Sequence, residues 1–590
     1  MIPSYLDPTI RADWEIAQAA EASMKSIDVL AGELGLESEE VIPMGRRLCK
    51  VDYRRVCERT SRRAAGRYVD VTAITPTPLG EGKTTTTMGL VQGFGKLNRR
   101  VTGAIRQPSG GPTFNIKGSA AGGGRSQCIP LTELSMGLTG DIDAITNAHN
   151  LCLVALTARM QHERNYDDAR LARSKLRRLD IDPDQVQIKW ALDFCAQSLR
   201  RITIGQGGKM DGFEMQSGFQ ISVSSELMAI LAIARDLRDL RERIAKVIVA
   251  YDRNGAPVTT VDLEVDGAMA AWLVKAINPN LLQTIEGQPV FVHAGPFANI
   301  AIGQSSIIAD ILGTRLSEYH ITESGFGADV GYEKFWNLKC RASGLTPDAV
   351  VIVATVRALK MHGGGPKVTP GVALDAVYRE EDCGLVEQGC ENLQAHMDIV
   401  RKSGIRPIVC INRFYTDTDA ETDIVRRAAE ANGGVVATAN HWRQGGEGAI
   451  ELAEAVISVC DEEKDFNYLY DLDSRLDERI ETIAREIYGA DGVHYSQRAW
   501  EKVRSLNEDP DSRNFGTCMV KTQLSLSHDP ELKNRPVGWQ LPIEDVLIFN
   551  GAGLIVPVAG NVSLMPGTAS NPSFRKIDID VETGNVTGLF

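Results

Sequence analysis

Residues 75–87 read Thr75-Pro-Thr-Pro-Leu-Gly80-Glu-Gly82-Lys83-Thr84-Thr-Thr-Thr87. They follow a short apolar run, Tyr68 to Ile74, and they precede apolar positions at Met88, Leu90 and Val91. Continuous apolar runs are typical of buried parallel strands, whereas glycine and proline mark the loops between elements. The segment therefore predicts a strand, a glycine-rich loop and a helix, in that order.

The loop contains the core of a P-loop, Gly82-Lys83-Thr84. In such a loop, backbone N–H groups and a helix N-terminus surround a polyphosphate. Lys83 would contact the terminal phosphates, and the Thr84 hydroxyl would bind Mg²⁺. Thr77 stands where the GxxxxGK[ST] signature has its first glycine, so a turn that merely caps a helix stays an alternative. The flanking strand and helix favour ATP binding, with phosphate contacts predicted at Thr75, Gly80, Glu81, Gly82, Lys83, Thr84 and Thr85.

Further apolar runs stand before turns along the chain, at Val290–Val292, Ala349–Ala354 and Pro407–Ile411. Strands that alternate with helices indicate an α/β fold with a mostly parallel sheet. The charged segment Leu227–Val247 is expected to form an outer helix.

Length and charge restrict the classes of protein. The 590 residues suggest three or four packing units, at about 100–200 residues each. The formal net charge of -13 disfavours binding to nucleic acid and requires local positive charge wherever an anion binds. Eleven cysteines without a CxxC pair indicate reduced thiols. Because neither a signal peptide nor a membrane span is predicted, we expect a cytoplasmic protein without membrane contact.

A second glycine-rich cluster extends from Arg106 to Arg125. Glycine at this density allows the backbone to approach a ligand closely, and Arg106, Lys117 and Arg125 add positive charge. A planar guanidinium suits a carboxylate or an acyl phosphate. A flexible linker is the alternative, but linkers rarely interleave Phe, Ile and basic residues with glycine.

Longer motifs stand in one order along the chain. They are TPTPLGEGKTTTTMGL from residue 75, KGSAAGGG from residue 117, Thr322-Glu323-Ser-Gly-Phe-Gly-Ala-Asp329, Val353-Ala-Thr-Val-Arg357-Ala-Leu-Lys360-Met-His362 and Gly445-Gly446-Glu447-Gly448. Together they resemble the formate–tetrahydrofolate ligase family over nearly the whole chain. The resemblance implies an enzyme of one-carbon metabolism that joins formate to N10 of tetrahydrofolate. ATP is split to ADP and phosphate through formyl phosphate, with Mg²⁺ and a monovalent cation (K⁺ or NH₄⁺), in a homotetramer.

The resemblance also implies roles for single residues. Lys83 and Arg106 are expected to be catalytic, with Arg106 at the formyl phosphate. Lys117 and Gly118 belong to the glycine-rich loop beside it. Phe414 and Trp442 match aromatic positions that bind the nucleotide base or the pterin, although a core tryptophan stays an alternative for Trp442. For Lys360 and His362, structural and functional roles are equally open.

Five residues depart from the family's usual pattern around the expected acid and acceptor site. Gln107 stands where glutamate is usual, Asn115 where glycine is usual, and Gly137, Asp143 and Ile302 where three histidines are usual. The nucleotide motif is unchanged, so the changes concern the acid and the acceptor.

Three hypotheses follow. The chain is an ordinary formate–tetrahydrofolate ligase, a divergent member that uses another carboxylate or another acceptor, or a non-catalytic paralogue that binds ATP or folate. Lys83, Thr84, Arg106 and Asp329 argue against the third, because a binding protein does not need them.

We expect a P-loop-type domain with a mostly parallel sheet and two further α/β lobes. The P-loop domain comprises residues 1–154 and 305–380. An inserted lobe spans 155–304, and a C-terminal lobe with the aromatic ring-binding positions spans 381–590.

Overall fold

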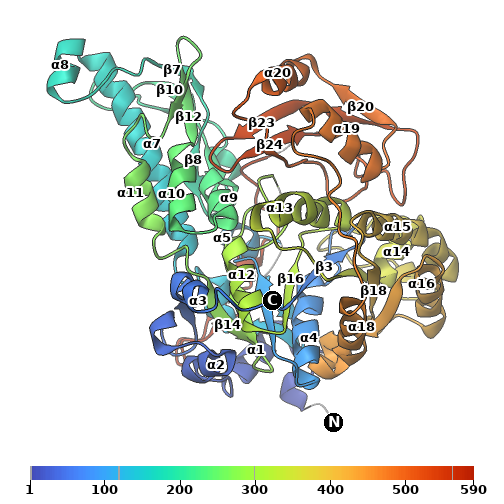
Figure 1. Ribbon diagram of the computed structural model, residues 1–590. Helices are drawn as coiled ribbons and strands as arrows, with labels where there is room; N and C mark the ends of the chain where they lie inside the picture. Colours follow the sequence, from blue (N-terminus) through green and yellow to red (C-terminus); the bar gives the residue numbers. More distant parts are fainter. Residues whose placement is uncertain (1–2, 117–119, 298, 561–562, 590) are drawn as a thin grey trace.

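Residues 3–116, 120–297, 299–560 and 563–589 are described by the computed structural model (Figure 1). A mixed sheet of 12 strands runs through the middle of this part of the chain. Its main path, in spatial order, is β1 (Val41–Pro43), β2 (Cys49–Val51), β14 (Asn280–Thr284), β15 (Pro289–Val292), β4 (Val101–Ile105), β16 (Tyr319–Glu323), β3 (Arg67–Ala73), β17 (Ala349–Ala354), β18 (Pro407–Asn412) and β19 (Val435–Ala439). Two more strands, β5 (Gly122–Gly123) and β6 (Ser126–Ile129), join it beside β14.

The sheet is parallel from β15 to β19 and antiparallel on the β1, β2 and β14 side. β3 is central, with Val69 opposite Ile321 of β16 and Val71 opposite Val351 of β17. The α/β fold with a mostly parallel sheet is therefore confirmed. The strands predicted near residues 290, 349 and 407 are β15, β17 and β18.

Alternate residues of the central strands face opposite layers of helices, as the two-residue period of a strand requires. On one face, Val69 and Val71 of β3 pack with Leu90 and Phe94 of helix α4 (Lys83–Lys96). On the other face of the sheet, Ile352 of β17 belongs to the hydrophobic core beneath the second layer of helices. The covering helices include α12 (Ile307–Leu316), α14 (Val356–His362), α15 (Cys383–Lys402), α16 (Asp419–Ala431) and α18 (Ile450–Cys460).

The region that contains α7 (Asp141–Asn165) stands above the sheet at the left of Figure 1. It includes β7 (Ile181–Val186), β8 (Trp190–Leu192), β11 (Phe219–Ile221), β12 (Ile248–Asp252), β13 (Pro257–Thr259) and α11 (Asp266–Leu273). The prediction of one outer helix over Leu227–Val247 is wrong. Two helices form there, and every residue of α9 (Glu226–Ile233) is buried, while α10 (Leu237–Ala245) buries only Leu240 and Ile244. The apolar run at 227–233 packs into the core, and the charged run that follows lies on the outside.

The C-terminal region has two parts. Helices α19 (Leu476–Glu486) and α20 (Gln497–Glu508) lie with β20 (Gly492–Tyr495), β22 (Gln540–Ile543), β23 (Asp545–Phe549) and β24 (Leu554–Val558) at the upper right of Figure 1. The segment after residue 563 then returns to the N-terminal region, where Leu589 packs with Ala17 and Leu48.

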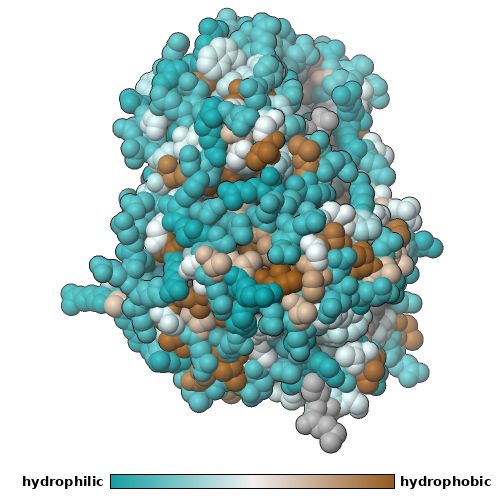
Figure 2. All heavy atoms as spheres, turned by 90° about the vertical axis from the view of Figure 1, so that its right-hand side faces the viewer, coloured by the Kyte–Doolittle hydropathy of each residue, from teal (hydrophilic) through white to brown (hydrophobic). Residues whose placement is uncertain are grey.

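The central sheet crosses both predicted domain borders. β14 and β15 fall within 155–304, and β18 and β19 fall within 381–590, yet all four pair in the same sheet as β3. The division into three lobes stays a prediction. No helix of the described residues is long and apolar enough to cross a membrane. The face in Figure 2 is mostly hydrophilic, with smaller hydrophobic areas between the polar side chains.

Candidate functional site

The loop between β3 and α4 has the backbone of a tight glycine turn. Gly80 and Gly82 have φ values of 81° and 72°, which side chains rarely adopt. A Cβ atom at Gly82 would lie 2.7 Å from Nδ2 of Asn412. α4 begins at Lys83, so the free N–H groups of its first turn open toward this loop. Together these features form a place where an anion can bind.

The ends of neighbouring strands hold the loop in place. Nδ2 of Asn412, the last residue of β18, donates to the Glu81 carbonyl at 3.0 Å. The Glu81 carboxylate accepts a hydrogen bond from the Thr77 N–H at 2.7 Å and another from the hydroxyl of Thr355, just after β17. Arg357 donates to the Gly80 carbonyl at 2.8 Å. Glu81 is therefore committed to shaping the loop.

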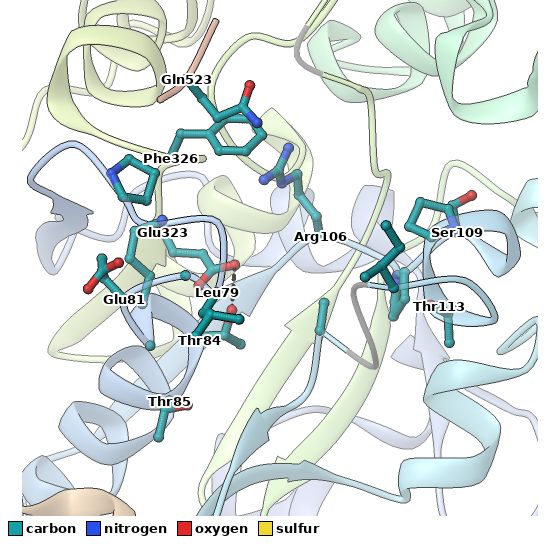
Figure 3. A pocket seen from close by; sticks show the side chains of 18 of the residues that line it. Leu79, Glu81, Thr84, Thr85, Arg106, Ser109, Thr113, Glu323, Phe326 and Gln523 are labelled. Carbon is teal, nitrogen blue, oxygen red and sulfur yellow. Dashed lines mark hydrogen bonds between the residues drawn. The ribbon is translucent and has the colours of Figure 1, made fainter. Parts of the chain in front are cut away.

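A cavity of about 550 Å³ opens above the loop. Its wall comprises Pro76 to Thr85, Arg106 to Ser109, Pro112, Thr113, Ile116, Ala120, Gly122, Gly295 to Phe297, Glu323, Phe326, Pro370, Gln523 and Leu524. In Figure 3, Glu81, Thr84 and Glu323 lie on one side, Ser109 and Thr113 lie on the other, and Arg106 lies between them. The structure thus brings six of the seven predicted phosphate contacts, Gly80 to Thr85, together with Arg106.

Two half-buried cations, Lys83 and Arg106, and the carboxylate of Glu323 define the electrostatics of the cavity. Burial lowers the pKa of the Lys83 ammonium, and the charges of Glu323 and Glu81 oppose that shift. Burial also lowers the pKa of Arg106, and Glu323 opposes that shift as well. Among the described residues, none accepts a hydrogen bond from the Lys83 ammonium. Two cations with so few protein partners suit an anionic ligand.

Glu323 ends β16 and contacts Thr84, which follows the loop between β3 and α4. The Thr84 hydroxyl donates to its Oε1 at 3.2 Å, drawn as a dashed line in Figure 3. Its Oε2 is buried and has no partner among the described groups. No cluster of three or more His, Cys, Asp or Glu suited to a metal occurs in the described ranges. A magnesium ion would therefore take Thr84, Glu323 and bound phosphate, and the free carboxylate oxygen fits a hard cation.

The second glycine-rich segment is tied to distant parts of the chain. Gly124 N–H donates to Asp13 at 2.7 Å, and Asn115 donates to the Gly567 carbonyl at 2.9 Å. Asp193 accepts from the Ser109 hydroxyl at 2.6 Å and from the Gly110 N–H at 2.7 Å. Burial raises the pKa of Asp193 to about 6, and these two hydrogen bonds oppose the shift. Lys117 and Gly118 lie outside the described residues, so their predicted role has no structural account.

Three predicted contacts lie away from the cavity wall. Thr75 is buried behind the loop, where its hydroxyl meets His396 at 2.9 Å. The Phe414 ring lies under the Arg357 guanidinium, whose Cζ is 4.8 Å from the centre of the ring. Trp442 accepts a hydrogen bond from Arg125 N–H at 2.8 Å, and its indole lies against Gly124. The predicted stacking of Phe414 and Trp442 on a base or pterin stays a prediction.

Lys360 and His362 make structural contacts. The Lys360 ammonium is buried and pairs with Glu421 at 2.5 Å. His362 contacts the Thr75 carbonyl at 2.9 Å and the Asn534 N–H at 3.0 Å, and burial lowers its pKa to about 3. His362 therefore holds the segment behind the loop between β3 and α4, whereas Lys360 joins α14 to α16.

The residues that depart from the family pattern fall into two groups. Three of them have structural positions. Asn115 donates a hydrogen bond to Gly567, Gly137 lies in a turn with a φ of 88°, and Ile302 is part of the hydrophobic core. Asp143 lies in the first turn of α7 and does not line the cavity. Gln107 lines the cavity, and neither polar atom of its buried side chain has a partner among the described residues.

Sequence reasoning missed several residues of the cavity wall. Glu323 and Phe326 belong to a quoted motif, but no site role was predicted for them. Phe326 has a φ of 62°, an uncommon backbone conformation for a large side chain, which turns the segment after β16 toward the cavity. A polar residue at the carboxyl end of a parallel strand is a signal for a site, but no strand was predicted at residues 319–323, so this signal was not available for Glu323.

Comparisons with known proteins agree over nearly the whole chain. The sequence model of the family "Formate--tetrahydrofolate ligase" matches residues 11–590. A formate–tetrahydrofolate ligase of Dehalococcoides mccartyi is 64% identical over 585 residues, which cover 99% of this chain and 98% of the relative. Those of Desulfotalea psychrophila and Desulforapulum autotrophicum are 62% and 61% identical, over 94% and 99% of this chain and all of each relative. These matches confirm the resemblance, and nothing in them supports an altered active site.

Proposed function

The chain belongs to the formate–tetrahydrofolate ligase family and has its ligase activity, and on that basis we propose how this chain's own residues carry out the reaction. One observation supports the proposal above all. Lys83, Glu323 and Arg106 follow or end the neighbouring parallel strands β3, β16 and β4, and all three line one cavity. Ligands of open α/β sheets bind at the carboxyl ends of such strands.

The segment around Gly82 acts as a P-loop for ATP. Its backbone N–H groups and the first turn of α4 surround the phosphates, and the Lys83 ammonium neutralises charge on the phosphoryl group that moves. Thr84 and Glu323 would hold Mg²⁺, which supplies further neutralisation of phosphate charge when bound. The Lys83 ammonium has few protein partners, so the negative charge of the triphosphate balances its positive charge in the cavity.

Arg106 binds formate. Its guanidinium lies in the cavity and holds the carboxylate so that one oxygen attacks the terminal phosphorus of ATP. The P–O bond to ADP breaks, and formyl phosphate forms. Phosphorylation is needed because a carboxylate is a poor electrophile, whereas an acyl phosphate carries a good leaving group.

Tetrahydrofolate then completes the reaction. Its N10 amine attacks the formyl carbon, the C–O bond to phosphate breaks, and phosphate leaves while the amine loses its proton. The apolar wall formed by Phe326, Phe297, Leu524 and Pro370 offers a surface for a flat ring. A non-catalytic binding role is not favoured, because Lys83 and Arg106 converge where binding alone would not require them.

Family resemblance supports two further parts of the proposal. They are activation by K⁺ or NH₄⁺ and assembly as a homotetramer, which rate measurements in a series of chloride salts and sedimentation equilibrium would test. A cytoplasmic location is in keeping with eleven unpaired cysteines.

Transfer of ¹⁸O tests the route through formyl phosphate. If the carboxylate oxygen attacks phosphorus, [¹⁸O]formate gives phosphate that carries one ¹⁸O atom. Unlabelled phosphate alongside normal product would overturn the acyl phosphate route while leaving the ligase activity in place.

A further inference from the structure

Asp193 holds the turn that follows Arg106 from outside the central sheet. It comes directly after β8, and its two carboxylate oxygens accept hydrogen bonds from two successive residues of the turn. Oδ1 accepts from the Ser109 hydroxyl at 2.6 Å, and Oδ2 accepts from the Gly110 N–H at 2.7 Å. Hydrogen bonds to an ionised carboxylate are stronger than neutral ones. Asp193 lies 84 positions after Ser109 and 83 after Gly110, so these hydrogen bonds join two regions that are distant in the sequence.

The turn also packs closely on the region that carries Asp193. A Cβ atom at Gly111 would lie 2.7 Å from Cδ1 of Ile221 and 3.1 Å from the backbone nitrogen of Cys195. A side chain at this position would require Ile221 and the backbone at Cys195 to move. Ser109 lines the cavity three residues after Arg106, so Asp193 fixes the wall that faces the phosphate loop.

Arg106 has few anchors of its own. Its one described hydrogen bond goes to the Pro296 carbonyl at 3.3 Å, which is long for a charged donor. A side chain at Gly325 would lie 2.8 Å from its Nη2, so the guanidinium has limited space on that side. The direction of Arg106 therefore depends on the backbone that follows it.

We infer that Asp193 is a positioning residue for the acid substrate, because its carboxylate fixes Ser109 and Gly110 and so aims Arg106 at the bound formate. The inference rests on the proposed function, which places formate at Arg106. Asp193 itself does not line the cavity and touches no reacting atom. Loss of its contacts should weaken formate binding and leave ATP binding to the separate loop at residues 80–85.

The test compares Michaelis constants in Asp193→Asn. Asparagine removes the negative charge, so the contacts to Ser109 and Gly110 become hydrogen bonds between neutral groups, which are weaker than those to a carboxylate. A hydrogen bond to a charged group is worth enough for roughly a tenfold change in KM for formate. We expect that rise with less than about a twofold change in KM for ATP. Ser109→Ala should act in the same direction, and the double variant should show less than the product of the single effects.

Asp262 offers a matched control in the same region. It accepts hydrogen bonds from the N–H and the hydroxyl of Thr259, both at 2.9 Å, and does not line the cavity. Asp262→Asn should leave KM for formate unchanged. An equal rise for formate and ATP, or the same rise in Asp262→Asn, would overturn the inference, because the contact would then only stabilise the fold.

The inference and the proposed function can fail separately. No formate-dependent turnover in the wild-type protein would overturn both. With wild-type turnover present, an unchanged KM for formate in Asp193→Asn would overturn the inference alone. If Asp193→Asn does not fold, Ser109→Ala takes its place, and an unchanged KM for formate there has the same meaning.

Discussion

The hydroxyl of Thr84 donates a hydrogen bond of 3.2 Å to the carboxylate of Glu323, which joins the first turn of α4 to the end of the neighbouring strand β16. The second oxygen of this carboxylate is buried and has no partner among the described groups. The sequence motif predicts that Thr84 binds magnesium, but only the fold brings Glu323 beside Thr84. Several predictions about ATP use rest on this pair and on Lys83 beside it.

Glu323→Gln tests the role of the carboxylate. Glutamine keeps an acceptor oxygen for Thr84 but removes the charge, and Mg²⁺ prefers carboxylate ligands. We expect the Mg²⁺ concentration for half-maximal rate to rise roughly tenfold, as for groups that support a metal site. Glu318→Gln is the control, since Glu318 precedes the same strand and pairs with Arg100 at the surface. If both variants show the same Mg²⁺ dependence, Glu323 does not bind Mg²⁺.

Lys83→Ala should abolish most turnover without harming the fold. The ammonium neutralises the phosphoryl group in transfer, and loss of one such group costs roughly a hundredfold or more in kcat. Because burial disfavours the charged ammonium, its removal should leave Tm unchanged or raise it. Lys96→Ala, at the other end of α4, is the matched control and should keep wild-type kcat. Normal turnover in Lys83→Ala would end the case for a catalytic lysine.

Asp70 should make stability depend on pH. Burial raises the pKa of this β3 carboxylate from 3.8 to about 7, although hydrogen bonds from Ser324 and Gln304 oppose the shift. The folded state then binds a proton more tightly than the unfolded state, so the free energy of unfolding falls as pH rises from about 4 to about 7. Asp70→Asn lacks this contribution. In urea unfolding, the free energy of unfolding of the variant should rise relative to that of the wild type up to about pH 7, and the difference should stay constant above that pH.

A difference between Asp70→Asn and the wild type that does not change between pH 5 and pH 8 would contradict this account. Other carboxylates titrate in both proteins, so the comparison isolates the one group.

Trp442→Ala tests the predicted ring contact. The indole lies against Gly124 of the glycine-rich segment, two residues after Gly122 of the cavity wall. An aromatic contact is worth about 1 kcal/mol, so either ADP or tetrahydrofolate should bind several-fold more weakly. Equilibrium titrations of both ligands measure it. Unchanged affinity for both would leave Trp442 with the structural role that was the alternative.

The local pattern of the sequence predicted the central part of the fold. The apolar run at residues 68–74 becomes β3, and the glycines at 80 and 82 take the backbone conformations that the predicted loop needs. The error at Leu227–Val247 arose because two helices with opposite burial stand next to each other, and a single pattern was assigned to both.

The groups that hold the site depend on contacts between distant residues. Asn412 and Glu81 are 331 positions apart, and Thr84 and Glu323 are 239 apart. Local periodicity carries no information about such pairs. Asn115 shows the same limit. Its difference from the family's usual glycine was assigned to the acid and acceptor site, but its side chain is hydrogen-bonded to Gly567 and Ala569 near the end of the chain.

ADP release tests the central claim most directly. Purified protein is given MgATP and K⁺, with formate and tetrahydrofolate added separately and then together, and ADP is measured over time. Rapid sustained release that needs both substrates is the result we predict, with Lys83→Ala reduced at least roughly a hundredfold. Bound ATP without ADP release when both substrates are present would contradict the account.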